Sequence, residues 1–302
     1  MAQTSVLTLV TDHTAGASIR NIAEAAAREL TEAGAACAEP DWLSEDRAVD
    51  IAFTGPWLEE AEARLSASGL LDMIDYCLQP TAHRKKKLFL ADMDSTMITV
   101  ECIDELADFA GFRKEVSAIT EQAMNGELDF NDAFRARVAM LKGLREPVLQ
   151  QVFDERVRLT PGAWTLVQTM RANGVYTALV SGGFTFFTNR VRDQVGFHMD
   201  MSNELLFENG SLTGIAAEPI LNSSAKLATL KQLMTKKNID RAETLAIGDG
   251  ANDIPMIEAA GLGVAYHAKQ AAITAADAAI RFGDLTTLLY YQGYRDSDFV
   301  AA

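Results

Sequence analysis

The chain has 302 residues, of which 48% are apolar, and a formal net charge of −15. This length is enough for more than one structural unit with its own core. The acidic excess argues against non-specific binding to nucleic acid or to an anionic membrane surface, so neither is expected as a partner. An anionic substrate would need a local cationic pocket or a metal ion.

The location that we predict is cytoplasmic. The first residues lack a basic region followed by an apolar stretch, so they do not predict a signal peptide. No uncharged apolar run reaches the roughly 18 residues of a membrane span. The cysteines Cys37, Cys77 and Cys102 show no metal-ligand spacing and are interpreted as reduced thiols.

Residues 1–80 are predicted to form a separate small unit of strands and helices. The expected strands are 5–10, 35–42, 48–53 and 73–78, and the expected helices are 19–32 and 58–68. This βαββαβ order is ferredoxin-like and resembles the ACT-like regulatory domains of amino-acid enzymes. A structural appendage, or a surface that joins two copies of the chain in a homodimer, is an equally open interpretation.

A polar segment, residues 79–87, separates this unit from the rest of the chain. It contains Pro80 and a basic run from His83 to Lys87, which we interpret as a solvated linker. We therefore predict a second unit over residues 81–302.

The second unit begins with an apolar strand at 88–91, and the next convincing strand is at 176–180. That separation is too long for a simple crossover, so an inserted module is expected between them. Helical periodicity and glycine breaks predict a helical cap at about 101–158, with helices at 102–110, 114–125, 130–142 and 146–153.

After the cap, strands and helices alternate. The expected elements are a helix at 163–172, a hairpin at 197–213 with its turn at Asn209-Gly210, a helix at 226–237, and strands at 244–247 and 263–266. This alternation predicts an α/β fold, a Rossmann-like parallel sheet with helices on both faces.

Polar residues follow several of the predicted strands, where ligands bind in open α/β sheets. They are Asp92 and Asp94, Ser181 and Gly182, the region of Lys226, and Asp249 with Asn252 and Asp253. A carboxylate pair such as Asp92 and Asp94 can supply a nucleophile that also binds a metal, and a neighbouring general acid.

These motifs resemble those of the haloacid dehalogenase-type phosphatases. DMDST at 92–96, SGG at 181–183, a lysine at 226 and GDGANDIPM at 248–256 stand in the order of that family. Glu101 and the segment 119–141 make the resemblance closest to the members that cleave phosphoserine. The resemblance spans roughly residues 88–295.

The resemblance implies roles for the acidic residues and for a cofactor. Asp92 would be the nucleophile that forms an aspartyl-phosphate, and Asp94 would be the general acid and later the base. A Mg²⁺ ion would be bound by Asp92, by the main-chain carbonyl of Asp94 and by Asp249.

The resemblance also implies a substrate, O-phospho-L-serine, hydrolysed to L-serine and phosphate in the last step of serine biosynthesis. Glu101 would meet its ammonium and Arg137 its carboxylate. The phosphate would be bound by Ser181 and Gly182 at a helix start, and by Lys226 and Asn252.

Other functions stay open at this point. One is a phosphatase or phosphotransferase of the same fold that acts on another small phosphate ester. A second is a non-catalytic amino-acid sensor centred on residues 1–80, which the intact acidic set and Lys226 argue against. Carbon–halogen cleavage is disfavoured because relatives with that chemistry lack the second aspartate, Asp94.

Overall fold

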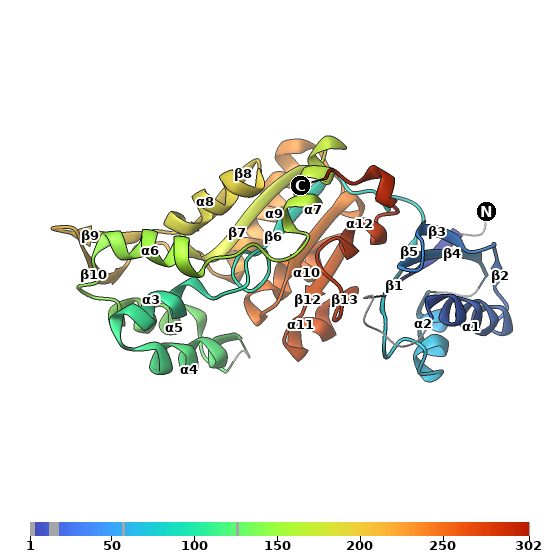
Figure 1. Ribbon diagram of the computed structural model, residues 1–302, viewed down its shortest axis with the longest axis horizontal. Coiled ribbons are helices and arrows are strands. Elements are labelled where there is room, and N and C mark those ends of the chain that lie inside the picture. The colour runs from blue at the N-terminus through green and yellow to red at the C-terminus, as the bar shows by residue number, and fades with distance from the viewer. Residues whose placement is uncertain (1–3, 12–17, 56–57, 125–126, 302) are drawn as a thin grey trace.

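A computed structural model of the chain describes residues 4–11, 18–55, 58–124 and 127–301. Figure 1 shows three parts along the longest axis. The N-terminal strands and helices lie at one end, a twisted sheet lies in the middle, and a group of helices with a hairpin lies at the other end.

The N-terminal part is a small antiparallel sheet with two helices. Its elements are β1 (Thr4–Val10), α1 (Ile19–Glu32), β2 (Ala36–Cys37), β3 (Asp41–Ser44), β4 (Ala48–Thr54), α2 (Leu58–Ala67) and β5 (Asp75–Pro80). Strand β1 lies between β4 and β5 and pairs antiparallel with both. Helix α1 buries Ile19, Ala23, Ala26 and Leu30, which lie three or four positions apart and so share one face.

The predicted strand at 35–42 is wrong as a single element. The segment forms two short strands, β2 and β3, and both pair with β4. Pro40 lies between them, and because proline has no backbone N–H it cannot continue a ladder of hydrogen bonds. The strand therefore breaks at this residue.

The central part is a parallel sheet. Its strands are β6 (Leu88–Ala91), β7 (Tyr176–Phe184), β8 (Met199–Asn203), β11 (Thr244–Gly248), β12 (Leu262–Tyr266) and β13 (Ala278–Ile280). The helices around it are α7 (Ala163–Ala172), α8 (Thr185–Val195), α9 (Ser223–Lys237), α10 (Ile254–Ala259), α11 (Gln270–Ala275) and α12 (Thr287–Tyr291). Single turns of 3₁₀-helix are η1 (Arg241–Glu243), η2 (Ala251–Asp253) and η3 (Asp296–Asp298).

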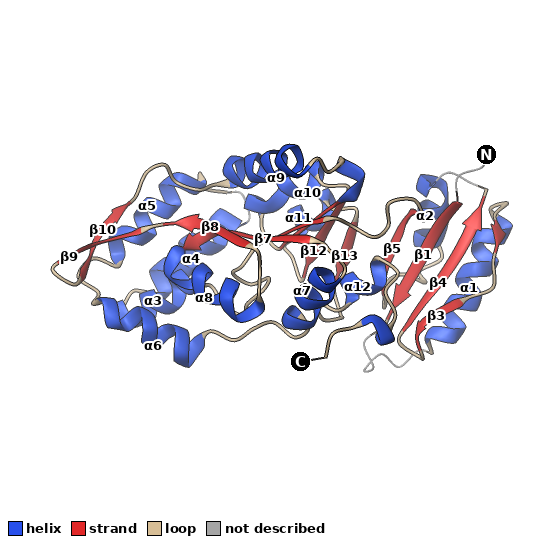
Figure 2. Ribbon diagram, turned by 90° about the horizontal axis from the view of Figure 1, so that it is seen from above, coloured by secondary structure: helices blue, strands red, loops and turns tan. Residues whose placement is uncertain are grey.

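Helices cover both faces of this sheet, as Figure 2 shows. Strand β6 lies between β11 and β7, parallel to both. Its side chains alternate between two apolar clusters: Phe89 packs with residues of α7 and α8, and Leu90 packs with residues of α9 and α10. Burial on both faces accounts for the apolar run of β6, and the predicted α/β class is confirmed.

The two sheets are joined into one. Strand β5 pairs antiparallel with β13 at Tyr76 and Ala279, so eleven of the strands in the described residues form a single mixed sheet. Next to this pairing, the buried carboxylate of Asp75 accepts hydrogen bonds from the backbone N–H groups of Arg281 at 2.7 Å and Gly283 at 2.7 Å. The purely parallel sheet that the sequence predicts is therefore extended by N-terminal strands.

The inserted helices form the third part. They are α3 (Cys102–Ala110), α4 (Arg113–Met124), α5 (Phe130–Met140) and α6 (Glu146–Arg156). A separate hairpin, β9 (Leu205–Glu208) and β10 (Ser211–Ala216), extends them, because Gly143 N–H donates to Leu212 O and Leu212 N–H donates to Leu144 O, both at 2.8 Å. The predicted hairpin at 197–213 is therefore partly wrong, since β8 joins the central sheet instead.

The interpretation of the basic run at 83–87 as a solvated linker is wrong for Arg84 and Lys86, which are half-buried and buried, whereas His83, Lys85 and Lys87 are exposed. Arg84 donates to both carboxylate oxygens of Asp50 on β4, to Thr8 Oγ1 at 2.7 Å, and to the carbonyl oxygens of Tyr290 and Tyr291 of α12 at 3.0 and 2.8 Å. One guanidinium thus connects the N-terminal sheet to the last helix of the central part.

Replacing Arg84 with alanine is expected to lower the free energy of unfolding by about 3 kcal/mol, because it leaves the buried Asp50 carboxylate without its cation. Thermal and urea unfolding measure the change. Arg64→Ala is the matched control, because it removes exposed ion pairs to Glu29 and Glu32 and should lower the stability much less. Equal losses in the two variants would contradict a special role for Arg84.

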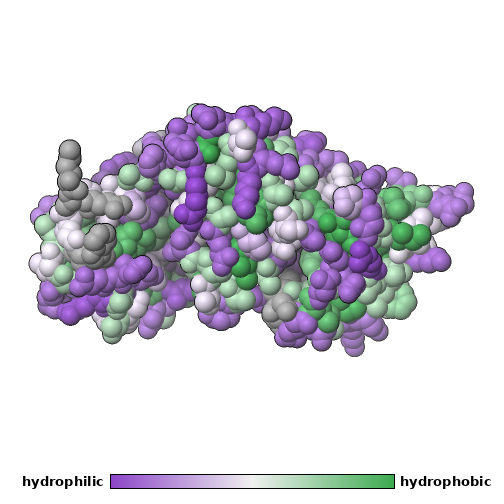
Figure 3. Space-filling model, turned by 180° about the vertical axis from the view of Figure 1, so that it is seen from behind, coloured by the Kyte–Doolittle hydropathy of each residue, from purple (hydrophilic) through white to green (hydrophobic). Residues whose placement is uncertain are grey.

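On the face shown in Figure 3, hydrophilic and hydrophobic residues are interspersed. Within the described residues, no helix combines the length and the apolar character needed to cross a membrane.

Candidate active site

Polar residues from three neighbouring strands meet at one edge of the central sheet. Asp92 and Asp94 follow β6, Asp249 follows β11, and Ser181 lies near the carboxyl end of β7. These strands are adjacent and parallel, so their carboxyl ends share an edge. The predicted convergence of these motifs is therefore observed.

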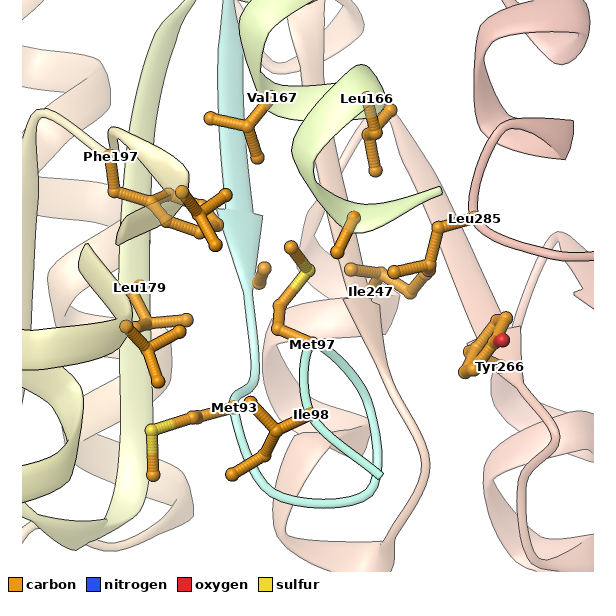
Figure 4. Close-up of a cluster of buried hydrophobic side chains, with 14 of the residues drawn as sticks. Met93, Met97, Ile98, Leu166, Val167, Leu179, Phe197, Ile247, Tyr266 and Leu285 are labelled. Carbon is orange, nitrogen blue, oxygen red and sulfur yellow. The ribbon is translucent and has the colours of Figure 1, made fainter. Parts of the chain in front are cut away.

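The loop after β6 is held by its apolar residues. Figure 4 shows Met93, Met97 and Ile98 in a buried cluster with Leu179 of β7 and Ile247 of β11. Met93 stands between Asp92 and Asp94 in the chain, so its burial helps to fix the backbone that carries both carboxyl groups.

Asp94 is fixed by two donors. The backbone N–H of Cys102 at the start of α3 donates to its Oδ1 at 2.8 Å, and Ser181 Oγ donates to its Oδ2 at 3.0 Å. Burial raises the pKa of Asp94, while the Cys102 and Ser181 hydrogen bonds act to lower it. A carboxyl group whose pKa is raised in this way is suited to give up and take back a proton.

Lys226 on α9 provides a buried positive charge. Its Nζ lies 2.7 Å from Asp92 Oδ1 and 2.6 Å from Asp253 Oδ1. Burial acts to lower the pKa of Lys226, but the charges of Asp253 and Asp92 outweigh it and raise the pKa. Asn222 precedes α9 and its side chain caps the first turn, so the lysine reaches the site from the N-terminal end of the helix.

Asp253 is a positioning group whose role the sequence motifs left open. Its Oδ2 accepts the backbone N–H groups of Asp249 and Gly250, both at 3.2 Å, and its Oδ1 meets Lys226. A Cβ on Gly248 would lie 2.3 Å from Asp253 Cγ, which is why a glycine stands there. Asp253 thus fixes both the loop after β11 and the lysine.

The carboxylates can hold a metal ion. Oxygens of Asp92, Asp249 and Asp253 come within 4.8 Å of one another. Burial and then the charge of Asp253 raise the pKa of Asp92 to about 7, and burial and then Glu101 raise that of Asp249. Several buried carboxyl groups thus face one ammonium, and oxygen donors of this kind suit a hard divalent cation.

The inserted helices form the other wall of a cavity above these carboxylates. The lining residues are Asp92, Asp94, Glu101, Ile103, Thr120, Ala123, Phe130, Phe134, Arg137, Ser181, Gly182, Gly183, Phe184, Asp249 and Asn252. Phe130 comes so close to β7 that a Cβ on Gly182 would lie 2.8 Å from its ring. Groups from the sheet and from the inserted helices therefore face the same space.

Two charged residues of this wall are shielded from solvent: Glu101 is half-buried and Arg137 is buried. Glu101 accepts a hydrogen bond from Ser95 Oγ at 2.6 Å, and burial and then the charge of Asp94 raise its pKa to about 8. Arg137 is 6% exposed and donates to Ala133 O at 3.2 Å and to Thr120 Oγ1 at 3.0 Å. A ligand ammonium beside Glu101 would lower the pKa of this carboxyl group and favour its carboxylate form, and a ligand carboxylate could meet the guanidinium of Arg137.

Nearly all the residues that the sequence singles out come together here. Lys226 is not among the lining residues but reaches them through Asp92. One detail is wrong: Ser181 and Gly182 do not start a helix, because β7 continues to Phe184 and α8 begins at Thr185. The sequence does not single out Ser95, although its hydroxyl bonds to Glu101. The backbone of Ser95 is left-handed, with φ of 55°, and a motif does not reveal such a conformation.

Residues 89–258 match the model of the haloacid dehalogenase-like hydrolase family, which is more than half of the chain. The chain belongs to this family.

Several proteins that are similar to this chain are named phosphoserine phosphatase. A relative named phosphoserine phosphatase from Archaeoglobus fulgidus is 43% identical over 217 residues, which are 71% of this chain and 63% of the relative. A solved substrate-bound phosphoserine phosphatase complex is 37% identical, with a TM-score of 0.66 over 68% of this chain and 98% of that one. The predicted resemblance to phosphoserine phosphatases is therefore confirmed.

One solved structure is similar over nearly the whole length. A HAD family hydrolase from Salmonella enterica subsp. enterica serovar Typhi is 31% identical, with a TM-score of 0.82 over 95% of this chain and 98% of that chain. The matched segment thus spans just under two thirds of the Archaeoglobus relative but almost all of these two solved chains.

Proposed function

We propose that the chain is a phosphoserine phosphatase, which hydrolyses O-phospho-L-serine to L-serine and phosphate. The observation that carries the proposal is one cavity that joins the acidic pair Asp92 and Asp94 to the charged pair Glu101 and Arg137. The names of the relatives support the same reaction.

Asp92 acts as the nucleophile. One carboxylate oxygen attacks the phosphorus in line, the bond from phosphorus to the serine oxygen breaks, and an aspartyl-phosphate forms. Lys226 supports this step, because its Nζ lies 2.7 Å from Asp92 Oδ1 and its positive charge stabilises the negative charge at the reacting phosphate.

Asp94 acts as the general acid and then as the base. In its protonated form it gives a proton to the departing serine oxygen, and as a carboxylate it then takes one from the water that releases phosphate. The backbone N–H of Cys102 holds the carboxyl group in place for both transfers, and Ser181 donates to it before the substrate binds.

Mg²⁺ is the cofactor in this proposal, held by Asp92, the main-chain carbonyl of Asp94 and Asp249. Of the three clustered carboxylates, Asp253 is the least suited to bind the ion, because its oxygens already accept hydrogen bonds from Lys226 and from two backbone N–H groups. The ion would supply positive charge against the phosphate oxygens when bound. Gly182, Lys226 and Asn252 would bind the other oxygens of the phosphate, and Ser181 would join them by turning its hydroxyl from Asp94 to the bound phosphate.

The test of the function is an assay of the purified chain against a panel of small phosphate esters, with and without Mg²⁺. Phosphoserine should be the best substrate, and chelation should remove the activity. Preference for another phosphate ester would overturn the substrate while retaining the reaction class.

Replacing Arg137 with alanine tests the specificity. The substrate carboxylate would be left buried and unpaired, at a cost on the order of 2–5 kcal/mol. We expect kcat/KM for phosphoserine to fall more than tenfold, with a much smaller loss for phosphoethanolamine, which has no carboxylate.

Glu101→Gln is the matched comparison, since it should hurt phosphoserine more than an analogue that lacks the amine. Kinetics of both variants on all three esters decide the matter. A uniform loss in Arg137→Ala would assign that side chain to the fold or to the phosphate instead of the carboxylate.

The N-terminal part is proposed to be a ferredoxin-like, ACT-like domain over residues 1–80, followed by the catalytic unit over 81–302 with its cap at about 101–158. The support is the strand arrangement, in which β1 lies between β4 and β5. A homodimer through this domain and a cytoplasmic location stay predictions.

A further inference from the structure

The guanidinium of Arg137 bonds to Thr120 of a second cap helix, and Thr120 in turn bonds to Asp104 of a third. Arg137 Nη1 donates to Thr120 Oγ1 at 3.0 Å, and Thr120 Oγ1 donates to Asp104 Oδ1 at 2.8 Å. Arg137 lies on α5, Thr120 on α4 and Asp104 on α3, so one chain of hydrogen bonds crosses three helices. Thr120 is 3% exposed and also lines the cavity.

The direction of these bonds follows from what a hydroxyl can do. It has one O–H to donate and two lone pairs to accept. The carboxylate of Asp104 is an acceptor and the guanidinium of Arg137 is only a donor. The proton of Thr120 is therefore committed to Asp104, and its lone pairs turn toward the arginine.

This arrangement orients the plane of the guanidinium. The Nε group donates to Ala133 O one turn earlier on the same helix, and Nη1 donates to Thr120. Two fixed points on a planar group determine where its other N–H donors face. Without Thr120, the hydrogen bond that Arg137 keeps among the described residues is the one to Ala133 of its own helix, and the side chain could rotate.

We infer that Thr120 is a positioning residue for specificity: it holds Arg137 in the orientation that receives the carboxylate of the substrate, and Asp104 fixes the orientation of its hydroxyl. The inference rests on the proposed function, because it assigns Arg137 to that carboxylate. Thr120 itself has no part in the phosphoryl chemistry, which takes place at Asp92.

Thr120→Val removes the hydroxyl and keeps the shape of the side chain. A hydrogen bond to a charged group is worth roughly a tenfold change or more in affinity. We expect kcat/KM for phosphoserine to fall about tenfold, mainly through KM, while kcat/KM for phosphoethanolamine changes less than about threefold. The ratio of the two values is the readout, because a general defect of the fold would lower both.

Two variants complete the design. Thr120→Ser keeps a hydroxyl and should restore the wild-type ratio. Ser117→Ala is the matched control: Ser117 donates to Asp104 at 2.6 Å from the same helix, and its loss leaves the Thr120–Arg137 bond in place, so the ratio should stay at the wild-type value. Thr120→Ala replaces the valine variant if that protein does not fold.

The outcomes separate the inference from the function on which it rests. If the wild type turns over phosphoserine but Thr120→Val leaves the ratio of the two kcat/KM values unchanged, the inference alone is overturned. An equal loss on both substrates is one such result. A wild-type protein that does not turn over phosphoserine overturns the proposed function and the inference with it.

Discussion

Asp92→Asn is expected to abolish turnover of phosphoserine while the protein stays folded. The amide has nearly the shape of the carboxylate but is a very poor nucleophile, so no acyl-phosphate can form at this position. Lys226 retains its second partner, Asp253 at 2.6 Å, so the buried ammonium is not stranded. The expected loss is therefore a chemical one.

Steady-state assays and trapping of phosphate on the protein measure this outcome. Asp200→Asn is the matched control, because Asp200 is also ion-paired and its side chain is 7% exposed, but it lies on β8 beside Arg192. The control should keep its activity. Near wild-type hydrolysis by Asp92→Asn, or phosphate bound at another residue, would refute the assignment.

Asp92 makes the stability of the wild-type protein depend on pH, and Asp92→Asn should remove this dependence. Folding raises the pKa of Asp92 from 3.8 to about 7, so between these values the folded state binds more protons than the unfolded state. The Asp92 carboxyl group therefore lowers the free energy of unfolding as the pH rises from about 4 to 7. Asparagine does not titrate, so the variant is spared this loss. In metal-free protein at neutral pH, Asp92→Asn should unfold at the same temperature as the wild type or above it.

Asp94→Asn is expected to slow phosphoserine hydrolysis by roughly 10²–10⁴-fold, the usual contribution of general acid–base catalysis. Asparagine can still accept from Cys102 N–H, which now binds Asp94 Oδ1 at 2.8 Å, so the loop should keep its shape. It cannot protonate a leaving oxygen.

An aryl phosphate distinguishes this role from a general defect. A phenolate with a low pKa leaves without help from an acid, so the loss in Asp94→Asn should shrink strongly for such an ester. The measurement is the rate of the chemical step for both substrates in wild type and variant. Equal losses would assign Asp94 to binding or to structure.

The sequence predicts well which carboxyl groups line this cavity, because its signals are local. DMDST follows an apolar strand, and GDGAND follows another, so each motif carries its residues to a strand end whatever the rest of the chain does. Asp92, Asp94 and Asp249 needed only the parallel arrangement of β6 and β11 to meet.

The contacts that the sequence could not predict join distant segments. Arg84 resembled its solvated neighbours until the folded chain brought it to Asp50 and to the carbonyl groups of α12. Thr120 resembled an ordinary helix residue, and only the packing of three helices gives its hydroxyl two partners. Periodicity predicts which face of a helix or strand is apolar, but it does not predict which polar groups its polar side chains will contact.

The pairing of β5 with β13 has a consequence for how the molecule avoids self-association. An outermost strand presents unpaired N–H and C=O groups, which can template the addition of another chain. Here β13 ends the parallel sheet, and β5 lies along it, with Asp75 engaging the backbone just beyond it. The outermost strands of the joined sheet on that side are β2 and β3, of two and four residues, with Pro40 between them, so neither offers a long stretch of backbone for an intruding strand to pair with.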